Sequence, residues 1–154
     1  MVELKEGDMA PQFSLPDKDG KVHALSMHLQ KTVVLYFYPK DDTPGCTTEA
    51  CGFRDLNLEI KKAGAQIIGI SPDNGQSHEK FSKKFSLNFP ILSDAGHEVA
   101  GKYGAWGKKK FMGKEFEGII RSTFIIKGGK IAKAYYGVKT EGHAKKILED
   151  LANI

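Results

Sequence analysis

Residues 33–38, VVLYFY, limit the possible folds more than any other stretch of the chain. This unbroken run of β-branched, aliphatic and aromatic residues is typical of a central strand that is buried on both faces. Residues 66–70 (QIIGI) and 123–126 (TFII) have the same character. Strands of this kind need packing layers on both sides, so the sequence predicts an α/β structure.

Helical patterns and turn signals complete this prediction. Apolar residues recur at helical spacing in residues 53–60, 81–85 and 144–151. The pairs 19–20 (DG) and 128–129 (GG) each separate two strand-like stretches closely enough to predict β-hairpins. Helical connections favour parallel strands and hairpins favour antiparallel ones. We therefore expect a central mixed β-sheet flanked by helices.

Length and charge narrow the class of protein. The 154 residues fit one domain, 1–154, without a linker or a repeat. No apolar run approaches the roughly 20 residues that cross a bilayer, so we expect no membrane partner. The start of the chain lacks the pattern of a secretory signal, which predicts a cytoplasmic protein, or a plastid one if an address segment has been removed. The net charge of +4 is spread out, and we interpret the run at residues 108–110 (KKK) as a solvated loop that binds no nucleic acid.

The stretch TPGC at residues 43–46 predicts the start of a helix. Thr43 can cap the helix, and Pro44 suits the first helical position, where a backbone N–H would have no partner. Cys46 then lies in the first turn, near unpaired N–H groups and the positive end of the helix dipole. This environment favours a thiolate over a thiol.

A helix start alone does not supply enough stabilisation for such an anion. A thiol with a pKa of about 8.5 is roughly 3% ionised at pH 7, whereas one with a pKa of about 6 is roughly 90% ionised. That difference corresponds to about 3.4 kcal/mol, and a helix terminus contributes about 0.3–1 kcal/mol, or up to about 2. We therefore expect a cation beside Cys46. His28, His97 and lysines are possible, but Arg121 is the better candidate because a guanidinium can face a thiolate and a second acceptor atom together.

Cys51 follows Cys46 by five residues. On a regular α-helix their Cα atoms would lie about 8.7 Å apart. A disulfide accepts at most about 6.8 Å. A bond between Cys46 and Cys51 therefore requires local unwinding, which Gly45 and Gly52 would ease.

Other readings of the cysteines are weaker. They could be buried small apolar residues, but the TPGC helix start argues against this. A structural disulfide is not needed in a domain of this size, and the spacing fits neither a zinc site nor a Cys-x-x-Cys motif. The five histidines are interpreted as surface or structural residues.

Several further residues have two readings. Asp41 and Asp42 could form a metal pair, but we favour solvated acids in a loop before a helix. Trp106 is interpreted as a packing residue. Arg54 either pairs with a neighbouring acid such as Asp55 or has a functional role, and the sequence leaves both open.

These residues resemble a known family. Pro39-x-x-x-Thr43-x-x-Cys46 resembles the active-site signature of the peroxiredoxins, and Cys46-Thr47-Thr48-x-Ala50-Cys51 with Arg54-Asp55 is similar to the peroxiredoxin Q, or bacterioferritin comigratory protein, subfamily. The resemblance extends to residues 7–20 (GDMAPQFSLPDKDG), 69–73 (GISPD), 89–94 (FPILSD) and 118–131 (GIIRSTFIIKGGKI). It covers nearly the whole chain.

The resemblance implies a thioredoxin-like fold with an N-terminal β-hairpin extension, and an enzyme that reduces hydrogen peroxide and organic hydroperoxides. By this resemblance Cys46 is the peroxidatic cysteine and Cys51 the resolving cysteine. Thr43 and Arg121 would orient the peroxide and stabilise the thiolate, and Pro39 would shield the pocket.

The resemblance also implies thioredoxin as the reductant, and we expect neither a metal nor an organic cofactor. Resolution within one chain removes the chemical need for a dimer, which favours a monomer. Glu49 stands where many relatives carry Gln, and we expect little consequence. The alternative function is a thiol-based redox sensor or relay protein that uses the same cysteine pair.

Overall fold

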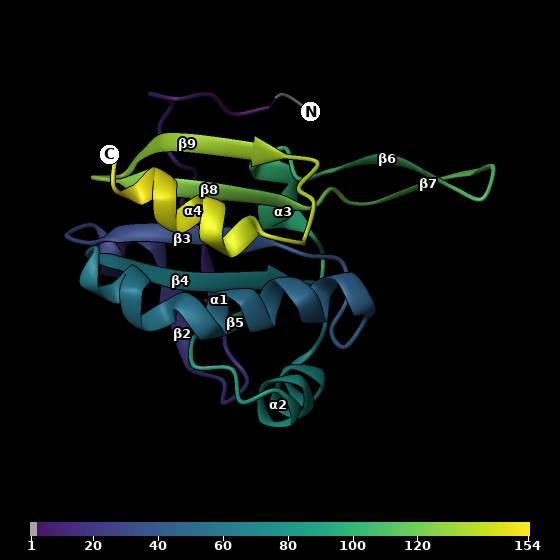
Figure 1. Cartoon of the computed structure of the whole chain (residues 1–154). Coiled ribbons are helices and arrows are strands. Elements are labelled where there is room, and N and C mark those ends of the chain that lie inside the picture. Colours follow the sequence, from purple (N-terminus) through teal and green to yellow (C-terminus); the bar gives the residue numbers. More distant parts are fainter. Residues whose placement is uncertain (1–2) are drawn as a thin grey trace.

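The structure, a computed structural model, describes residues 3–154 apart from the side chain of Phe111. A five-stranded sheet in the order β5-β4-β3-β8-β9 forms the centre of the molecule (Figure 1). Its strands are β3 (Thr32–Phe37), β4 (Ala65–Ser71), β5 (Ile91–Ser93), β8 (Ser122–Lys127) and β9 (Lys130–Tyr136). The predicted mixed sheet is confirmed, because β3 pairs parallel with β4 and antiparallel with β8.

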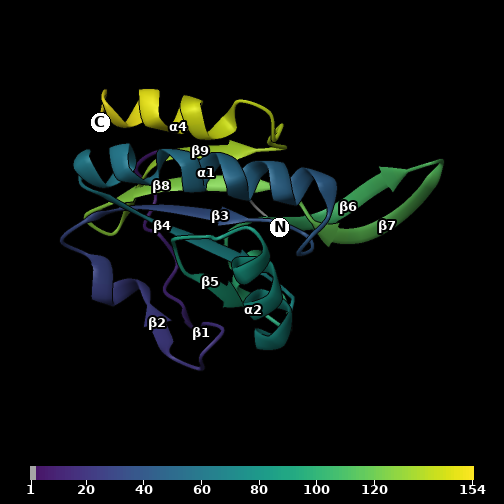
Figure 2. The same ribbon diagram turned by 60° about the horizontal axis from the view of Figure 1, so that its bottom comes forward.

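Helices cover both faces of this sheet. The helices α1 (Pro44–Lys62) and α4 (His143–Leu151) lie side by side on one face (Figures 1 and 2). Phe81 of α2 (Gly75–Lys84) belongs to the same apolar cluster. The other face packs against α3 (Glu98–Lys102), the short helix η1 (Leu25–His28) and the segment around Phe13.

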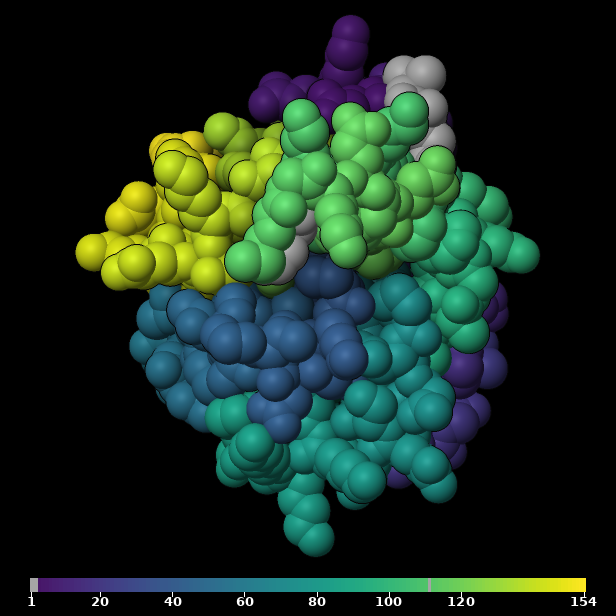
Figure 3. Space-filling view, turned by 90° about the vertical axis from the view of Figure 1, so that its right-hand side faces the viewer, coloured from purple at the N-terminus to yellow at the C-terminus, as the bar shows by residue number. Residues whose placement is uncertain are grey.

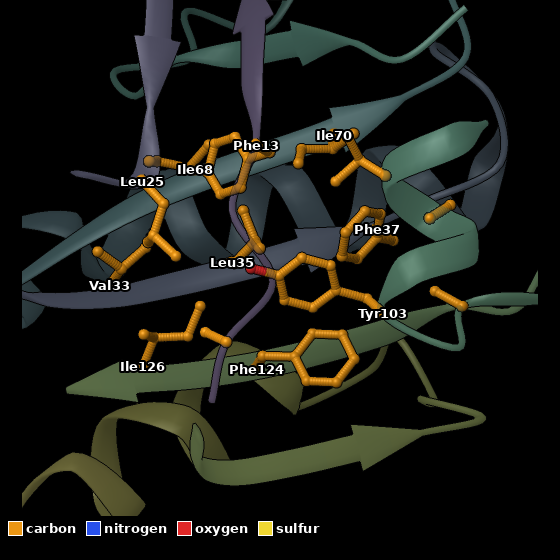
Figure 4. Packing of buried hydrophobic residues seen from close by; sticks show 14 of the residues in the cluster. Phe13, Leu25, Val33, Leu35, Phe37, Ile68, Ile70, Tyr103, Phe124 and Ile126 are labelled. Carbon is orange, nitrogen blue, oxygen red and sulfur yellow. The ribbon is translucent and has the colours of Figure 1, made fainter. Parts of the chain in front are cut away.

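The strand β3 is buried on both faces, as its composition predicts. Val33, Leu35 and Phe37 contribute to the cluster drawn in Figure 4, whereas Val34 and Tyr36 face α1. Each fully buried aliphatic or aromatic side chain contributes about 1.5–3 kcal/mol, so this strand anchors both layers.

The predicted hairpins are both present. β1 (Ser14–Pro16) pairs with β2 (Val22–Ala24), and β8 turns into β9 through Gly128 and Gly129, both with positive φ. The first of these is the expected N-terminal hairpin.

A third hairpin corrects the sequence analysis. The lysine run 108–110 is not a loop: it belongs to β6 (Trp106–Phe111), which pairs with β7 (Lys114–Ile119) and projects from the body (Figures 1 and 2). Two lysines of β6 lie opposite two glutamates of β7, and residues 112–113 form the turn with positive φ. The run of three lysines, without alternating apolar residues, hid this hairpin. No helix within residues 3–154 is long and apolar enough to cross a membrane.

Candidate active site

Cys46 lies in the first turn of α1, at the end of the sheet where β3 leads into the helix. Its side chain is 1% exposed. Pro44 is the first helical residue, as predicted, and Thr43 is the N-cap with extended backbone angles. The predicted capping by the Thr43 side chain is wrong, because its hydroxyl donates to the Lys40 carbonyl at 2.9 Å. The positive end of the helix dipole nevertheless adjoins Cys46.

Arg121, which immediately precedes β8, provides the expected cation beside Cys46. Its Nη2 lies 3.4 Å from the Cys46 Sγ, and its Nη1 donates to Glu49 Oε1 at 2.8 Å. Gly45 leaves room for this approach, because a Cβ atom there would lie 3.3 Å from Arg121 Nη2, a tight contact. A larger residue at position 45 would crowd the guanidinium group.

Glu49 is the second partner of Arg121, a role that the sequence did not predict. It lies three residues after Cys46, so both side chains emerge from one face of α1. Its side chain is fully buried, and within residues 3–154 its Oε2 has no hydrogen-bond partner. Burial raises the pKa of Glu49 to about 7, against the opposing effect of Arg121. The three-residue spacing was the signal that could have placed Glu49 in the site.

One guanidinium group thus faces two groups that can carry negative charge. Burial disfavours the charged form of Arg121, but Glu49 and Cys46 together raise its pKa above the ordinary value. The hydroxyl of Tyr36 is buried nearby, and burial, with Glu49 and Cys46, raises its pKa well above the usual range. Tyr36 is therefore a neutral phenol at physiological pH, and Arg121 supplies the positive charge.

Cys51 lies on the same unbroken helix, and both thiols are free. It is half-buried and lines a separate hollow of about 430 Å³ between α1 and the start of α4. The two sulfur atoms therefore face different surroundings in this state. Pro39 is half-buried in the segment between β3 and α1. In Figure 3 the start of α1 and the segment before it, in blue, lie between the green β6–β7 hairpin and the teal α2.

The two candidate histidines and Arg54 make their contacts elsewhere. His97 stacks on Trp106 with ring centroids 3.7 Å apart, which confirms Trp106 as a packing residue. His28 stacks with His23. Arg54 bonds to Asp55 and to a carbonyl at the end of α2, so its contacts are structural.

Asp41 corrects another expectation. Asp42 is exposed and pairs with Lys84, as expected for a solvated acid, but Asp41 is 6% exposed and contacts His78 at 2.7 Å. Within residues 3–154, one group of three potential metal ligands comes from Asp41, Asp73 and His78, whose ligand atoms lie within 4.8 Å of one another. These atoms already form hydrogen bonds to one another or to neighbouring side chains.

Comparison with known proteins agrees with this arrangement. A family model described as the AhpC/TSA family matches residues 6–134. The chain belongs to this family. Peroxiredoxin Bcp of Escherichia coli K12 is 47% identical over 149 residues, 96% of each chain, and a Helicobacter pylori relative is 51% identical over 152 residues, 98% of this chain and all of that protein.

Solved structures of peroxiredoxins share the fold. A cysteine mutant of PrxQ from Xylella fastidiosa matches with a TM-score of 0.93 at 31% identity over 99% of this chain and 98% of that one. The bacterioferritin comigratory protein of Xanthomonas campestris, studied for its alkyl peroxide reduction activity, matches with a TM-score of 0.87 at 39% identity over 92% and 90% of the two chains. The chain is therefore a peroxiredoxin, a thiol-dependent peroxidase with a thioredoxin-like fold. Its substrates are hydroperoxides, and it needs a reductant.

Proposed function

We propose that Cys46 is the peroxidatic cysteine of this peroxiredoxin and that it reduces hydrogen peroxide and organic hydroperoxides. One observation carries the proposal: a buried sulfur at a helix start, 3.4 Å from a guanidinium nitrogen. A helix dipole and an adjacent, half-buried cation both favour the thiolate, which is the nucleophilic form.

In the first step the Cys46 thiolate attacks one peroxide oxygen. An S–O bond forms and the O–O bond breaks, so the sulfur loses two electrons and the peroxide gains them. The departing oxygen takes up the proton that the Cys46 thiol released when it formed the thiolate, and it leaves as water or an alcohol. Arg121 is suited to stabilise the charge that develops on it, and Thr43 is the second proposed donor once its hydroxyl turns from Lys40. Pro39 would shield the pocket from water.

In the second step Cys51 resolves the sulfenic acid. Its sulfur bonds to Cys46, and the sulfenic hydroxyl leaves as water. The continuous helix between the two cysteines must unwind first, because five helical residues separate Cα atoms by about 8.7 Å. A dithiol, which we propose to be thioredoxin, then returns two electrons. This cycle fits a monomer in a reducing compartment such as the cytoplasm.

The test uses both cysteine variants. Cys46→Ser should consume no peroxide above the uncatalysed rate. Cys51→Ser should form the Cys46 sulfenic acid at a nearly unchanged rate, measured by stopped flow and by mass spectrometry after trapping, but should lose thioredoxin-linked turnover. Peroxide consumption at the wild-type rate by Cys46→Ser would refute the assignment.

The alternative, a redox sensor that relays oxidation to another protein, predicts a different outcome. Wild-type protein would then react with peroxide slowly, and a mixed disulfide with a protein other than thioredoxin would accumulate.

A further inference from the structure

A buried polar network lies beneath the segment of residues 38–43, which we call the strap because it joins β3 to the first turn of α1. At its centre, Asp41 accepts three hydrogen bonds. Tyr38 donates its hydroxyl to Oδ1 at 2.5 Å, and Ser77 donates to Oδ2 at 2.8 Å. His78 Nδ1 lies 2.7 Å from the same Oδ2. Both carboxylate oxygens are thus occupied.

The contacts of His78 favour a ring that carries hydrogen on both nitrogens. Its Nδ1 faces the Asp41 carboxylate, and its Nε2 lies 3.1 Å from the Leu92 carbonyl, which can only accept. A neutral imidazole has one N–H and could satisfy only one of these acceptors. Because Tyr38 and Ser77 also donate to Asp41, the carboxylate is favoured in its ionised form. This geometry favours an ion pair between His78 and Asp41, whose side chains are 0% and 3% exposed.

The strap is also fixed through its backbone. The Asp41 N–H donates to Asp73 Oδ2 at 2.8 Å, and that oxygen also accepts from Ser71 at the end of β4. The network therefore ties the strap to β4, α2 and, through the Leu92 carbonyl, β5.

Asp42 directly follows Asp41, the residue that anchors the strap. Its φ of 57° lies in the left-handed region, which Asp and Asn adopt more readily than other non-glycine residues. Thr43 and the first turn of α1 come next. Only Asp42 and Thr43 therefore separate the residue that holds the strap from the helical turn that has to unwind.

We infer that His78 is a positioning residue for the peroxidase reaction: paired with Asp41, it holds the strap so that Cys46 stays folded against Arg121, and it sets the cost of the unwinding that precedes disulfide formation. This inference rests on the proposed function of the two cysteines. The metal-like grouping of Asp41, Asp73 and His78 has this structural explanation, since hydrogen bonds use its ligand atoms.

The inference predicts opposite changes in two successive steps. Weakening the anchor lowers the population with an assembled site, which slows the attack on peroxide. The same change raises the unwound population and speeds the closure of the disulfide. A shorter-lived sulfenic acid is then less often oxidised further to the sulfinic acid.

The decisive variant is His78→Gln, which removes the charge but keeps an amide donor. We expect disulfide closure to become about tenfold faster and sulfenic acid formation several-fold slower, as expected when a buried pair loses one charge. Both rate constants come from stopped flow with hydrogen peroxide, and intact-mass spectrometry gives the sulfinic fraction. The matched control is Tyr103→Phe, which removes a buried hydroxyl bond to Pro11 in the other core cluster.

The ratio of the rate constant for disulfide closure to the rate constant for sulfenic acid formation decides the outcome. Tyr103→Phe should lower the free energy of unfolding without moving this ratio. An equal shift in Tyr103→Phe and His78→Gln, or none in either, would overturn the inference. If His78→Gln does not fold, Ser77→Ala removes one donor to Asp41 and must shift the ratio in the same direction to a smaller extent; an unchanged ratio there is equally decisive.

Two further results separate this inference from the proposed function. Absence of a sulfenic acid on wild-type Cys46 would refute the function, whatever His78 does. Nitrogen-15 spectra of the reduced protein should show hydrogen on both ring nitrogens of His78, and a neutral ring would remove the ion pair on which the inference stands.

Discussion

Two buried carboxylates flank the start of α1, and they differ in how completely they are hydrogen-bonded. Asp41, just before the helix, accepts three bonds that occupy both oxygens. Glu49, inside the helix, bonds to Arg121 through one oxygen, and its other oxygen has no partner in the described part of the chain. A fully paired buried charge holds structure, whereas an incompletely paired one is close to changing its protonation state. The first carboxylate belongs to the scaffold and the second to the reactive site.

Neutralising the scaffold carboxylate should have the largest effect. Asp41→Asn leaves His78 charged and buried without its partner, which should lower the free energy of unfolding by about 3–5 kcal/mol. Asp42→Asn is the matched control, because its pair with Lys84 is exposed and worth about 0–1 kcal/mol, and Asn tolerates the same positive φ. Urea unfolding measures both. Equal losses in the two variants would show that Asp41 has no special structural role.

Removing Arg121, the cation of the reactive site, should have the second-largest effect. Arg121→Met takes away the group that faces both Cys46 and Glu49, and loss of one such donor reduces rates by about 10²–10³-fold. Stopped-flow measurement of the peroxide reaction gives this factor. Arg54→Met is the control. Arg54 is the only other arginine in the sequence, and it contacts Asp55 and the Phe85 carbonyl. A comparable loss of rate in both variants would exclude a specific role for Arg121.

The sequence predicted those features that depend on local pattern. The apolar runs identified β3, β4 and β8, and the Thr-Pro pair located the start of α1. The reach of Arg121 to Cys46 followed from the need of a thiolate for a cation. The anchoring of Asp41 depends on Ser77 and His78, which are 36 and 37 positions away, and no local pattern encodes that contact. The burial of Asp41 therefore had to come from the structure.

Glu49, in the reactive site, was also only partly predictable from the sequence. Glu49 lies within one helical turn of Cys46, so its place on the same face was predictable. Its pairing with Arg121 was not, because that contact joins positions 72 residues apart. The β6–β7 hairpin escaped detection for a different reason, since β6 carries three consecutive lysines and the two strands contain few apolar residues.

The pH dependence of stability adds a third buried group, His143, to this comparison. Burial raises the pKa of Glu49 from 4.5 to about 7, so its stabilisation is complete below pH 4.5 and is lost as the pH rises to 7. Burial lowers the pKa of His143 from 6.5 to about 4, so its stabilisation is complete above pH 6.5 and is lost as the pH falls to 4. Each group changes the free energy of unfolding by about 3 kcal/mol over its pH range, and the two changes run in opposite directions with pH.

These two contributions should nearly cancel in the wild-type protein between pH 4.5 and 6.5. Glu49→Gln should unmask His143, so that stability rises with pH, and His143→Gln should show the reverse slope. Urea unfolding at several pH values measures these slopes. Parallel pH profiles in the two variants would contradict the assignment of both groups.

The smallest expected effect is that of Glu49→Gln on the rate of the peroxide reaction. Below pH 7 Glu49 carries a proton and matches Gln in charge, so the variant and the wild type should react at similar rates near pH 5.5. Above pH 7 the carboxylate competes with Cys46 for the single guanidinium group, and the variant should become a few-fold faster by pH 8. The quantity to measure is the rate constant of Glu49→Gln divided by that of the wild type, as a function of pH. If this ratio instead falls as the pH rises, the Glu49 carboxylate assists the reaction, and its free oxygen is then the atom that accepts the proton of Cys46.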